Sequence, residues 1–399
     1  MHVLLIHNRY QQPGGEDAVF ENEKALLEAH GHTIECYQRS NDELAGLGPT
    51  GRLRAAAATL WSRRSYQDLI AVIERFRPAV AHFTNTFPLV SPSAYYACHR
   101  RGVAVVQTVQ NYRLVCPSGV LLRDGAICED CVGRSFAWPG IRHRCYRNSA
   151  AQSATVAAML WSHRQLKTWS RRVDLYVSAT EFSRAKLAEG GIPADRIRVK
   201  PNFLNRDPGA DGRAAQGDYA LFVGRLAPVK GLRTLLDAWR GLPDIPLHIA
   251  GGGPMLESLS REVESEEMRH VRLLGYLPNS DIPDLMRNAR FLVFPSEWYE
   301  GFPVTIVEAF ACGLPVLASR LGGMAEVVDE GATGRHFVPG NADDLREQAR
   351  ALWQDHAATQ GMGQEARAVF ESRYTAERNY EILSAIYEEA IQRRKQANP

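Results

Sequence analysis

The sequence predicts an α/β protein made of two successive doubly wound domains that face each other across a cleft. Short apolar runs rich in β-branched residues alternate with longer segments of helical period, a pattern typical of parallel sheets built from βαβ units. A length of 399 residues favours two domains over one. Asp, Pro and Gly residues gathered at 205–217 separate two such series and are typical of a linker.

The first series covers residues 1–205, the second covers 206–375, and a final helical segment covers 376–399. In the first series we expect strands at 2–8, 33–38, 79–84, 103–109, 174–178 and 197–200, with helices at 16–30, 66–76, 91–101, 151–172 and 181–190. In the second we expect strands at 219–223, 247–250, 271–274, 291–294, 315–318 and 335–338, with helices at 232–240, 254–267, 280–288, 303–312 and 324–328. Long helices at 342–356 and 376–394 close the chain, the first of them capped by Asn341.

The composition narrows the class of protein. Hydrophobic residues make up 45% and charged residues 23% of the chain, which is typical of a soluble globular protein. Because the net charge is only +2, we expect no nucleic-acid partner. The apolar N-terminal run lacks a basic region and a cleavage site, so it predicts a first strand rather than a signal peptide. Since no segment approaches the length of a membrane-spanning helix, we expect a cytoplasmic protein whose seven cysteines are mostly reduced.

Basic residues and tryptophans are concentrated between residues 51 and 186. They are Arg52, Arg54, Arg63, Arg64, Arg142, Arg144, Arg147, Arg164, Lys167, Arg171 and Arg172, interleaved with Trp61, Trp138, Trp161 and Trp169. A basic surface that carries aromatic side chains suits peripheral contact with an anionic membrane, here its inner face. A solvated helix face with tryptophans in the core accounts for the same pattern equally well.

Two loops of the second series favour an anionic ligand, since ligands of such sheets bind beyond the carboxyl ends of the strands. The first follows the strand that ends at Gly224 and places Arg225 and Lys230 beside the start of a helix, where two cations and backbone N–H groups suit a diphosphate. The second contains Gly252 and allows a close approach to the backbone. A tight turn into a helix that begins with Pro254 explains the second loop as well.

The segment from Glu300 to Glu308 is the most informative of the chain. Pro303 suits the first position of a helix, where its missing N–H costs nothing. Glu300 then precedes the helix, Glu308 lies about a turn and a half inside it, and both carboxylates point toward one cleft. The free N–H groups at 301–304 face an anion.

Four motifs of the second series occur together at defined spacing. They are Gly224-Arg225 with Lys230-Gly231, the Glu-x7-Glu pair Glu300 and Glu308, Gly301-Phe302-Pro303 between them, and Gly322-Gly323 with Glu326. This combination resembles the family 4 retaining glycosyltransferases, which have the GT-B fold. The resemblance covers the second series nearly end to end.

The resemblance implies a role for each matching residue. Glu308 would hold the ribose hydroxyls of a UDP- or GDP-sugar, Arg225 and Lys230 would neutralise the diphosphate leaving group, and Glu300 would contact the transferred sugar. The remaining donor-binding positions would be Gly15, Gly224, Gly252, Gly301, Phe302, Pro303 and Val304. Retention through a front-face displacement would need neither an enzyme nucleophile nor a catalytic metal, and the helix at 376–399 would cross back to the first domain.

The first series supplies the candidate acceptor side. Gly14-Gly15 lies against the donor phosphates or the acceptor in similar proteins, or is simply a flexible loop. His82 and Asn85 follow a strand and line the cleft, unless His82 is a satisfied structural histidine. Related enzymes often carry His-Asn where this chain has Gln110-Asn111. Since glutamine does not titrate, either hydrogen bonding suffices at position 110, or the substrate preference differs, or the activity is weak.

An insertion at about 111–150 holds Cys116, Cys128, Cys131 and Cys145. Four thiols that include a C-x2-C pair have the count and spacing of a structural zinc site. Disulfides and packing thiols are the alternatives. A closed four-thiolate site would serve architecture rather than catalysis, and we expect the insertion to form a lid on the acceptor side.

The leading hypothesis is therefore a retaining hexosyltransferase that uses a UDP- or GDP-sugar and a glycan or lipid-linked acceptor in the synthesis of cell-surface polysaccharide or glycoconjugate. A sugar-nucleotide epimerase or a phosphorylase on the same fold is a second hypothesis. A non-catalytic nucleotide-sugar-binding protein is a third, which Gln110 keeps open.

Overall fold

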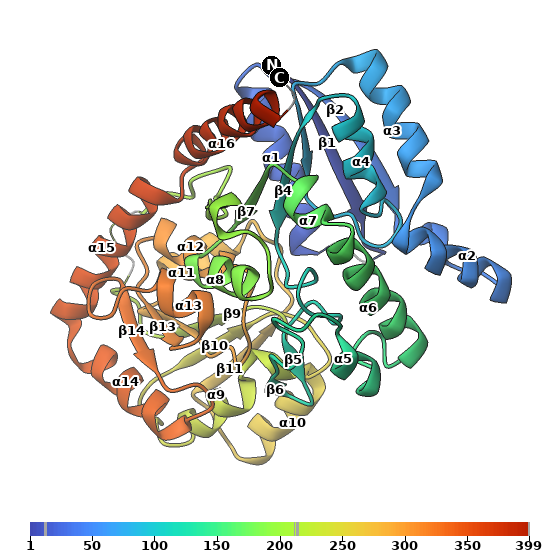
Figure 1. Ribbon diagram of the computed structural model, residues 1–399. Coiled ribbons are helices and arrows are strands. Elements are labelled where there is room, and N and C mark those ends of the chain that lie inside the picture. The colour runs from blue at the N-terminus through green and yellow to red at the C-terminus, as the bar shows by residue number, and fades with distance from the viewer. Residues whose placement is uncertain (12–13, 211, 213–214, 398–399) are drawn as a thin grey trace. The chain divides into compact units, whose positions relative to one another are not determined.

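The computed structural model describes residues 1–11, 14–210, 212 and 215–397. The chain forms two compact units, each with its own parallel sheet (Figure 1). Unit 1 comprises Met1–Arg123, Cys128–Asn202 and Asn379–Pro399, and unit 2 comprises Asp124–Ile127 and Phe203–Arg378. Among the helices of the described residues, none is both long and apolar enough to span a bilayer.

The sheet of unit 1 has six strands in the order β2-β1-β3-β4-β7-β8, and all neighbours are parallel. The strands are β1 (His2–Arg9), β2 (Thr33–Ser40), β3 (Val80–Phe83), β4 (Ala104–Val109), β7 (Leu175–Ser178) and β8 (Ile197–Val199). The helices are α1 (Gly15–Ala29), α2 (Pro49–Leu60), α3 (Arg63–Phe76), α4 (Ser93–Arg100), α5 (Trp138–Arg142), α6 (Ala150–Gln165), α7 (Thr168–Arg171), α8 (Glu181–Glu189) and α16 (Ala376–Ala397). The short strands β5 (Leu122–Arg123) and β6 (Ala126–Ile127) pair with each other.

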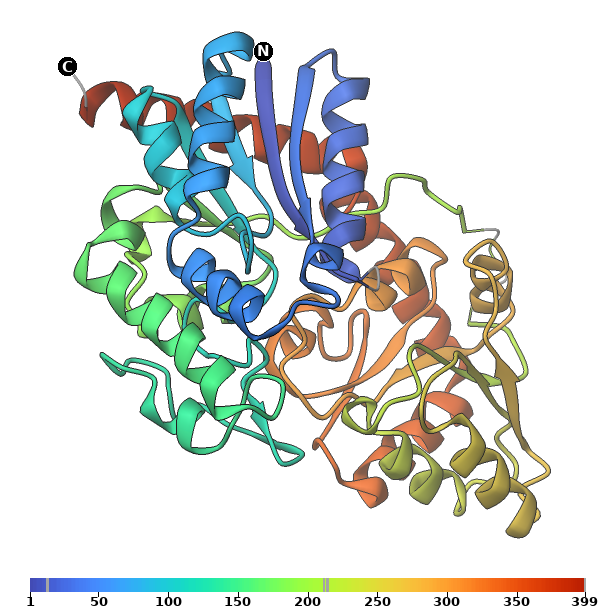
Figure 2. The same ribbon diagram turned by 90° about the vertical axis from the view of Figure 1, so that its right-hand side faces the viewer.

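Helix α16 completes the core of unit 1. Its residues Leu383, Ile386 and Tyr387 pack with strand residues such as Val3 and Val106 on one face of the sheet. Figure 2 shows α16 in red behind these strands. The helix is also held by polar contacts, because Arg394 donates to Asp174 at 2.7 Å and Lys200 donates to Asn379 at 3.0 Å.

The sheet of unit 2 has the order β11-β10-β9-β12-β13-β14, and all neighbours are parallel. The strands are β9 (Ala220–Val223), β10 (Leu247–Ala250), β11 (Val271–Gly275), β12 (Phe291–Phe294), β13 (Val316–Ser319) and β14 (Gly334–Phe337). The helices are α9 (Leu232–Trp239), α10 (Leu256–Ser265), α11 (Ile282–Arg287), α12 (Val304–Ala311), α13 (Gly322–Val327), α14 (Ala342–Gln354) and α15 (His356–Arg373). The inner strands β9, β12 and β13 are buried on both faces, whereas the edge strand β11 is partly exposed, and an apolar core lies on each side of the sheet.

The expected strands are all present, whereas some helices differ. Helices α2 and α15 were not expected, because the alanine-rich and glycine-containing stretches that form them have a weak apolar stripe. The helix expected at 151–172 is broken at Lys167, whose φ of 54° ends α6 and starts α7. Pro303 is the residue before α12 rather than its first residue.

Candidate functional site

In unit 2, the strand order reverses direction between β9 and β12. Counted along the chain of this unit the order is 3-2-1-4-5-6, so the first and fourth strands are neighbours and their loops leave in opposite directions. Ligands of doubly wound sheets bind at this switch point, beyond the carboxyl ends of the strands. The two loops that follow β9 and β12 carry the predicted Arg225, Lys230 and Glu300.

A glycine allows these two loops to touch. Gly231 has φ of +68°, and a Cβ added there would lie 1.8 Å from the carbonyl oxygen of Pro295. The backbone N–H of Glu297 donates to the Val229 carbonyl at 2.9 Å. The contact therefore requires glycine at position 231, both for its left-handed conformation and for space.

Lys230 and Glu300 meet at this contact. Lys230 Nζ lies 2.7 Å from Glu300 Oε1, and the Ser296 hydroxyl donates to the same oxygen at 2.5 Å. Glu300 is only 7% exposed, so the pair lies in a region of low effective dielectric. Arg225, by contrast, is exposed and forms no ion pair within the described residues.

Helix α12 places the second carboxylate. The helix begins at Val304 and has no side-chain cap, so its first N–H groups are available to an anion. Glu308 is its fifth residue and lines a cavity of about 350 Å³ together with Val223, at the end of β9, and Thr305. Burial raises the pKa of Glu308.

The loop after β10 is tied to the loop after β9. The Gly224 N–H donates to the Ala250 carbonyl at 3.0 Å, and the Leu226 N–H donates to the Gly252 carbonyl at 2.9 Å. A Cβ on Gly252 would meet only the Cβ of Tyr276, at 3.6 Å, so this backbone is open to a ligand. Gly301, Phe302 and Pro303 lie between the β12 strand and α12, as the sequence predicts.

In unit 1, His82 has the surroundings of a structural histidine, which is the alternative to a residue that lines the cleft. Its side chain is fully buried, Nδ1 lies 2.7 Å from the Tyr387 hydroxyl, and Nε2 lies 2.6 Å from the Thr108 hydroxyl. Both ring nitrogens are therefore occupied, and burial lowers the pKa of His82. The residue links the sheet to α16.

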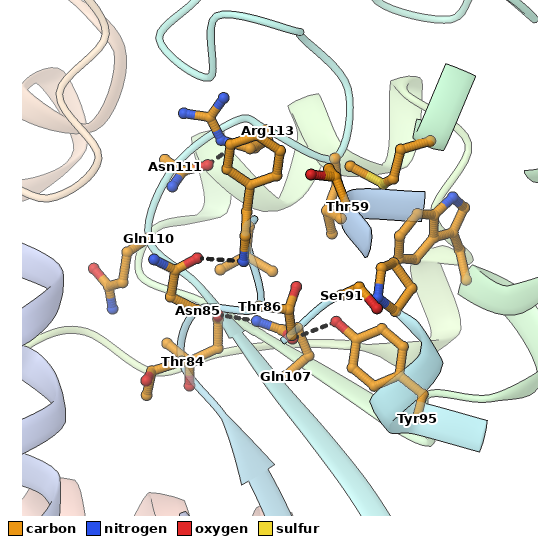
Figure 3. A pocket seen from close by; sticks show the side chains of 17 residues that line it. Thr59, Thr84, Asn85, Thr86, Ser91, Tyr95, Gln107, Gln110, Asn111 and Arg113 are labelled. Carbon is orange, nitrogen blue, oxygen red and sulfur yellow. Dashed lines mark hydrogen bonds between the residues drawn. The ribbon is translucent and has the colours of Figure 1, made fainter. Parts of the chain in front are cut away.

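The other acceptor-side candidates gather around one cavity at the carboxyl ends of β3 and β4 (Figure 3). Asn85, Gln110 and Asn111 line it. Gln110 and Asn202 exchange hydrogen bonds of 3.0 and 3.2 Å, and Asn111 donates to Glu16 on the first turn of α1. Gly15 is the first residue of α1, and a Cβ there would meet no atom within 4 Å.

The sequence did not identify three further residues of this cavity. Arg113 and Asn111 lie on one side of it, and Tyr95 and Gln107 on the other, with the Tyr95 hydroxyl donating to Gln107 at 2.6 Å (Figure 3). Gln107 could have been identified as a site residue, because it is a glutamine in the middle of a largely apolar strand. Nothing in the sequence, however, indicates that Tyr95 lies beside it.

The four cysteines of the insertion line a single small cavity in unit 1. All four are unpaired by disulfides, and burial raises the pKa of Cys131 to about 11. Four thiols are a donor set that suits zinc. Nevertheless, no group of three or more His, Cys, Asp or Glu side chains in the described part of the chain has an arrangement that would hold a metal.

Comparison with known proteins identifies the domain that holds the predicted donor site. Residues 206–369 match the family model described as "Glycosyl transferases group 1". The matched segment makes up less than half of the chain. It contains the β9, β10 and β12 loops described above.

Sequence relatives match part of the chain. An uncharacterized glycosyltransferase of Methanocaldococcus jannaschii is 32% identical over 176 residues, which is 44% of this chain and 49% of that protein. The O-antigen chain mannosyltransferase B of Escherichia coli is 29% identical over 239 residues, which is 52% of this chain and 61% of that protein. The chain thus spans about half of the length of these relatives.

Among solved structures, Anabaena Alr3699/HepE in complex with UDP superimposes with a TM-score of 0.69 at 18% identity, covering 96% of this chain and 99% of that one. At this identity the likeness establishes the fold alone. The predicted GT-B class with two Rossmann-like units is confirmed.

Proposed function

We propose that this protein is a retaining glycosyltransferase that moves a hexose-type sugar from a UDP- or GDP-linked donor to a glycan or lipid-linked acceptor. The observation that carries the proposal is the position of Lys230, Glu300 and the uncapped start of α12 at the switch point of the segment that matches the group 1 family model. The relative that is named an O-antigen chain mannosyltransferase supports an acceptor of cell-surface polysaccharide synthesis, and the UDP complex supports a nucleotide-linked donor.

The proposed chemistry is stabilisation of a leaving group. Negative charge develops on the diphosphate as the sugar departs, and fixed cations with oriented N–H groups lower the energy of that state. Arg225 and Lys230 would supply the cations, and Gly301 to Val304 the N–H groups. The ion pair of Lys230 with Glu300 would hold both side chains in place until the donor's sugar contacts Glu300 and its phosphate contacts Lys230.

Glu308 would bind the ribose hydroxyls, and the backbone at Gly224 and Gly252 would complete the donor side. No residue of this scheme acts as a nucleophile, and the arginine and lysine take the place of a catalytic cation. On the acceptor side, Gln110 would act as a hydrogen-bond partner, since its amide already exchanges two hydrogen bonds with Asn202. Gly15 would approach the donor phosphates or the acceptor.

The test is release of free UDP or GDP from a panel of nucleotide sugars, measured in the presence of EDTA with and without acceptor extracts. We expect acceptor-dependent release, and we expect Lys230→Ala to lower kcat/KM by about 100-fold or more because a transition-state contact is lost. Arg233→Ala is the matched control, because this exposed arginine lies one turn further along the same segment.

Two outcomes would replace the proposal. Donor conversion without any acceptor would indicate an epimerase. Tight nucleotide-sugar binding with no turnover would indicate a binding protein. If EDTA abolishes the release of UDP or GDP, only the proposal that the reaction needs no catalytic metal would be wrong.

We also propose that Cys116, Cys128, Cys131 and Cys145 hold a structural zinc ion, supported by the shared cavity that they line and by their donor chemistry. The purified chain should contain about one zinc, and Cys128→Ser together with Cys131→Ser should remove it. Cys98→Ser is the control, because Cys98 is buried elsewhere, in α4. Well under one zinc per chain, with two disulfides by thiol titration, would overturn this assignment.

A further inference from the structure

A second cavity of unit 1 adjoins the polar cavity beneath Gln110. It is a groove of about 370 Å³ between α2 and α6, which lie side by side in Figures 1 and 2. The two cavities share the lining residues Thr59 and Phe87. The two cavities are therefore neighbours in unit 1.

Most of the residues that line the groove are apolar. Its walls are formed by Leu44, Leu47, Ala55, Ala56, Thr59, Phe87, Pro88, Tyr146, Thr155 and Val156, together with Gln152. The small side chains of Ala55 and Ala56 on α2 leave this space open. A flexible hydrocarbon chain is the kind of ligand that such a groove accepts.

Arginines line both cavities. Arg52 and Arg147 line the groove, and Arg113 lines the polar cavity. The Arg113 guanidinium lies 4.5 Å from the centre of the Phe87 ring, which both cavities share. Its Nε is buried and has no hydrogen-bond partner within the described residues.

The two arginines of the groove, Arg52 and Arg147, have no carboxylate beside them among the described residues, whereas Arg113 interacts with the charge of Glu16. None of the described residues that line either cavity is an aspartate or a glutamate, and neither Arg52 nor Arg147 forms an ion pair with a described carboxylate. Uncompensated guanidinium groups beside an apolar groove favour a phosphate, which they bind in a bidentate manner.

The polar cavity suits a sugar. Amide side chains of Asn85, Gln107 and Gln110 and hydroxyls of threonines line it beside the ring of Tyr95 (Figure 3). Donors and acceptors next to an aromatic face match the hydroxyls and the C–H faces of a carbohydrate. Unit 1 therefore has a polar cavity that suits sugar hydroxyls beside a groove that is lined by apolar side chains and two arginines.

We propose that the acceptor is a lipid-linked glycosyl phosphate or diphosphate whose lipid chain lies in the α2–α6 groove. Its phosphate binds the arginines that line the groove, Arg52 and Arg147, and its sugar points toward the polar cavity, where its hydroxyls meet the amide side chains. This assignment rests on the proposed function and selects the lipid-linked class of acceptor. On the outer side of α2, Leu53 is 73% exposed between Arg52 and Arg54, which suits a helix that draws its ligand from a membrane surface.

The test uses farnesyl diphosphate as the probe, with farnesol and inorganic diphosphate as comparisons, and measures binding by calorimetry with saturating UDP so that the donor site is filled. We expect farnesyl diphosphate to bind at least about tenfold more tightly than either fragment, because both the groove and the arginines contribute. Ala56→Trp, which fills the groove, should weaken binding by about tenfold or more. Ala57→Trp, on the exposed side of the same helix, should leave it unchanged.

The charge is tested separately. Arg52→Ala with Arg147→Ala should weaken farnesyl diphosphate by about tenfold or more while farnesol is unaffected, and the exposed Arg54→Ala should have no effect. Inorganic diphosphate that binds as tightly as farnesyl diphosphate would overturn the proposal, and so would binding that Ala56→Trp leaves unchanged.

The lipid proposal and the proposed transferase function can fail independently of each other. UDP affinity, measured in the same samples, should be the same in every groove variant, and Lys230→Ala should leave farnesyl diphosphate binding intact. If UDP binds and farnesyl diphosphate does not, the lipid assignment fails alone. If neither UDP nor GDP binds, the proposed transferase fails.

Discussion

At the scale of single residues, the candidate donor site combines a carboxylate whose charge is compensated with a buried carboxylate whose pKa is raised. Glu300 is paired with Lys230 and accepts a hydrogen bond from Ser296, so its charge is compensated. Glu308 lines a cavity, and burial raises its pKa above the ordinary value of 4.5. Burial therefore makes the ionised form of Glu308 less favourable than that of an exposed carboxyl, although ribose binding calls for the acceptor oxygens of a carboxylate.

Glu308→Gln should stabilise the nucleotide-free protein at pH 8 and weaken its affinity for UDP or GDP by about tenfold or more. A carboxyl whose pKa is higher in the folded state costs stability as pH rises above its unfolded value, and it costs nothing below that value. The gain in Tm should therefore vanish near pH 4. Thermal unfolding at both pH values checks this, with the exposed Glu347→Gln as control. An equal change at both pH values would contradict it.

At the scale of elements, the two loops at the switch point depend on Gly231. Its left-handed backbone and its contact with Pro295 are both incompatible with a side chain. We expect Gly231→Ala to lower the free energy of unfolding by about 2–3 kcal/mol or more and to weaken nucleotide binding, as measured by urea denaturation and calorimetry.

Gly340→Ala is the matched control for this loop. Gly340 has φ of +74°, but a Cβ there meets no atom within 4 Å. Gly340→Ala should lower the free energy of unfolding by only about 1–2 kcal/mol, which is the cost of the left-handed conformation. It should leave nucleotide affinity unchanged. Equal effects of the two substitutions would show that the approach to Pro295 is unimportant.

At the scale of the whole molecule, the end of the chain belongs to the unit formed by its beginning. Helix α16 contributes Leu383, Ile386 and Tyr387 to the core around β1 and β4. Ending the chain after Thr375 should therefore unfold unit 1, since it removes several fully buried side chains that each contribute about 2–5 kcal/mol.

Limited proteolysis checks this prediction. Fragments of unit 1 should be degraded rapidly in the truncated protein, whereas unit 2 should survive and keep its nucleotide affinity. Ending the chain after Lys395 removes only exposed or terminal positions and should have no effect. Survival of unit 1 in the shorter chain would mean that the α16 contacts are dispensable.

Hydrophobic periodicity alone was sufficient to predict the twelve strands of the two six-stranded sheets and the doubly wound class. The inner strands are the plainest case, because a strand that is buried on both faces is a continuous apolar run. The spacing of Glu300, Pro303 and Glu308 indicated a helix start between two carboxylates, because that relation is local in sequence. Local rules do not extend to α2 and α15, whose apolar stripes are weak.

The tertiary structure decided what depends on contacts between distant segments. It joined Lys230 to Glu300 and enclosed His82 between Tyr387 and Thr108, 305 and 26 residues away. It also placed α2 beside α6 and so created a groove that neither helix contains alone. The sequence thus determined the elements and the chemical groups that they carry, whereas packing decided which of those groups meet, because burial and hydrogen bonding are properties of the folded neighbourhood.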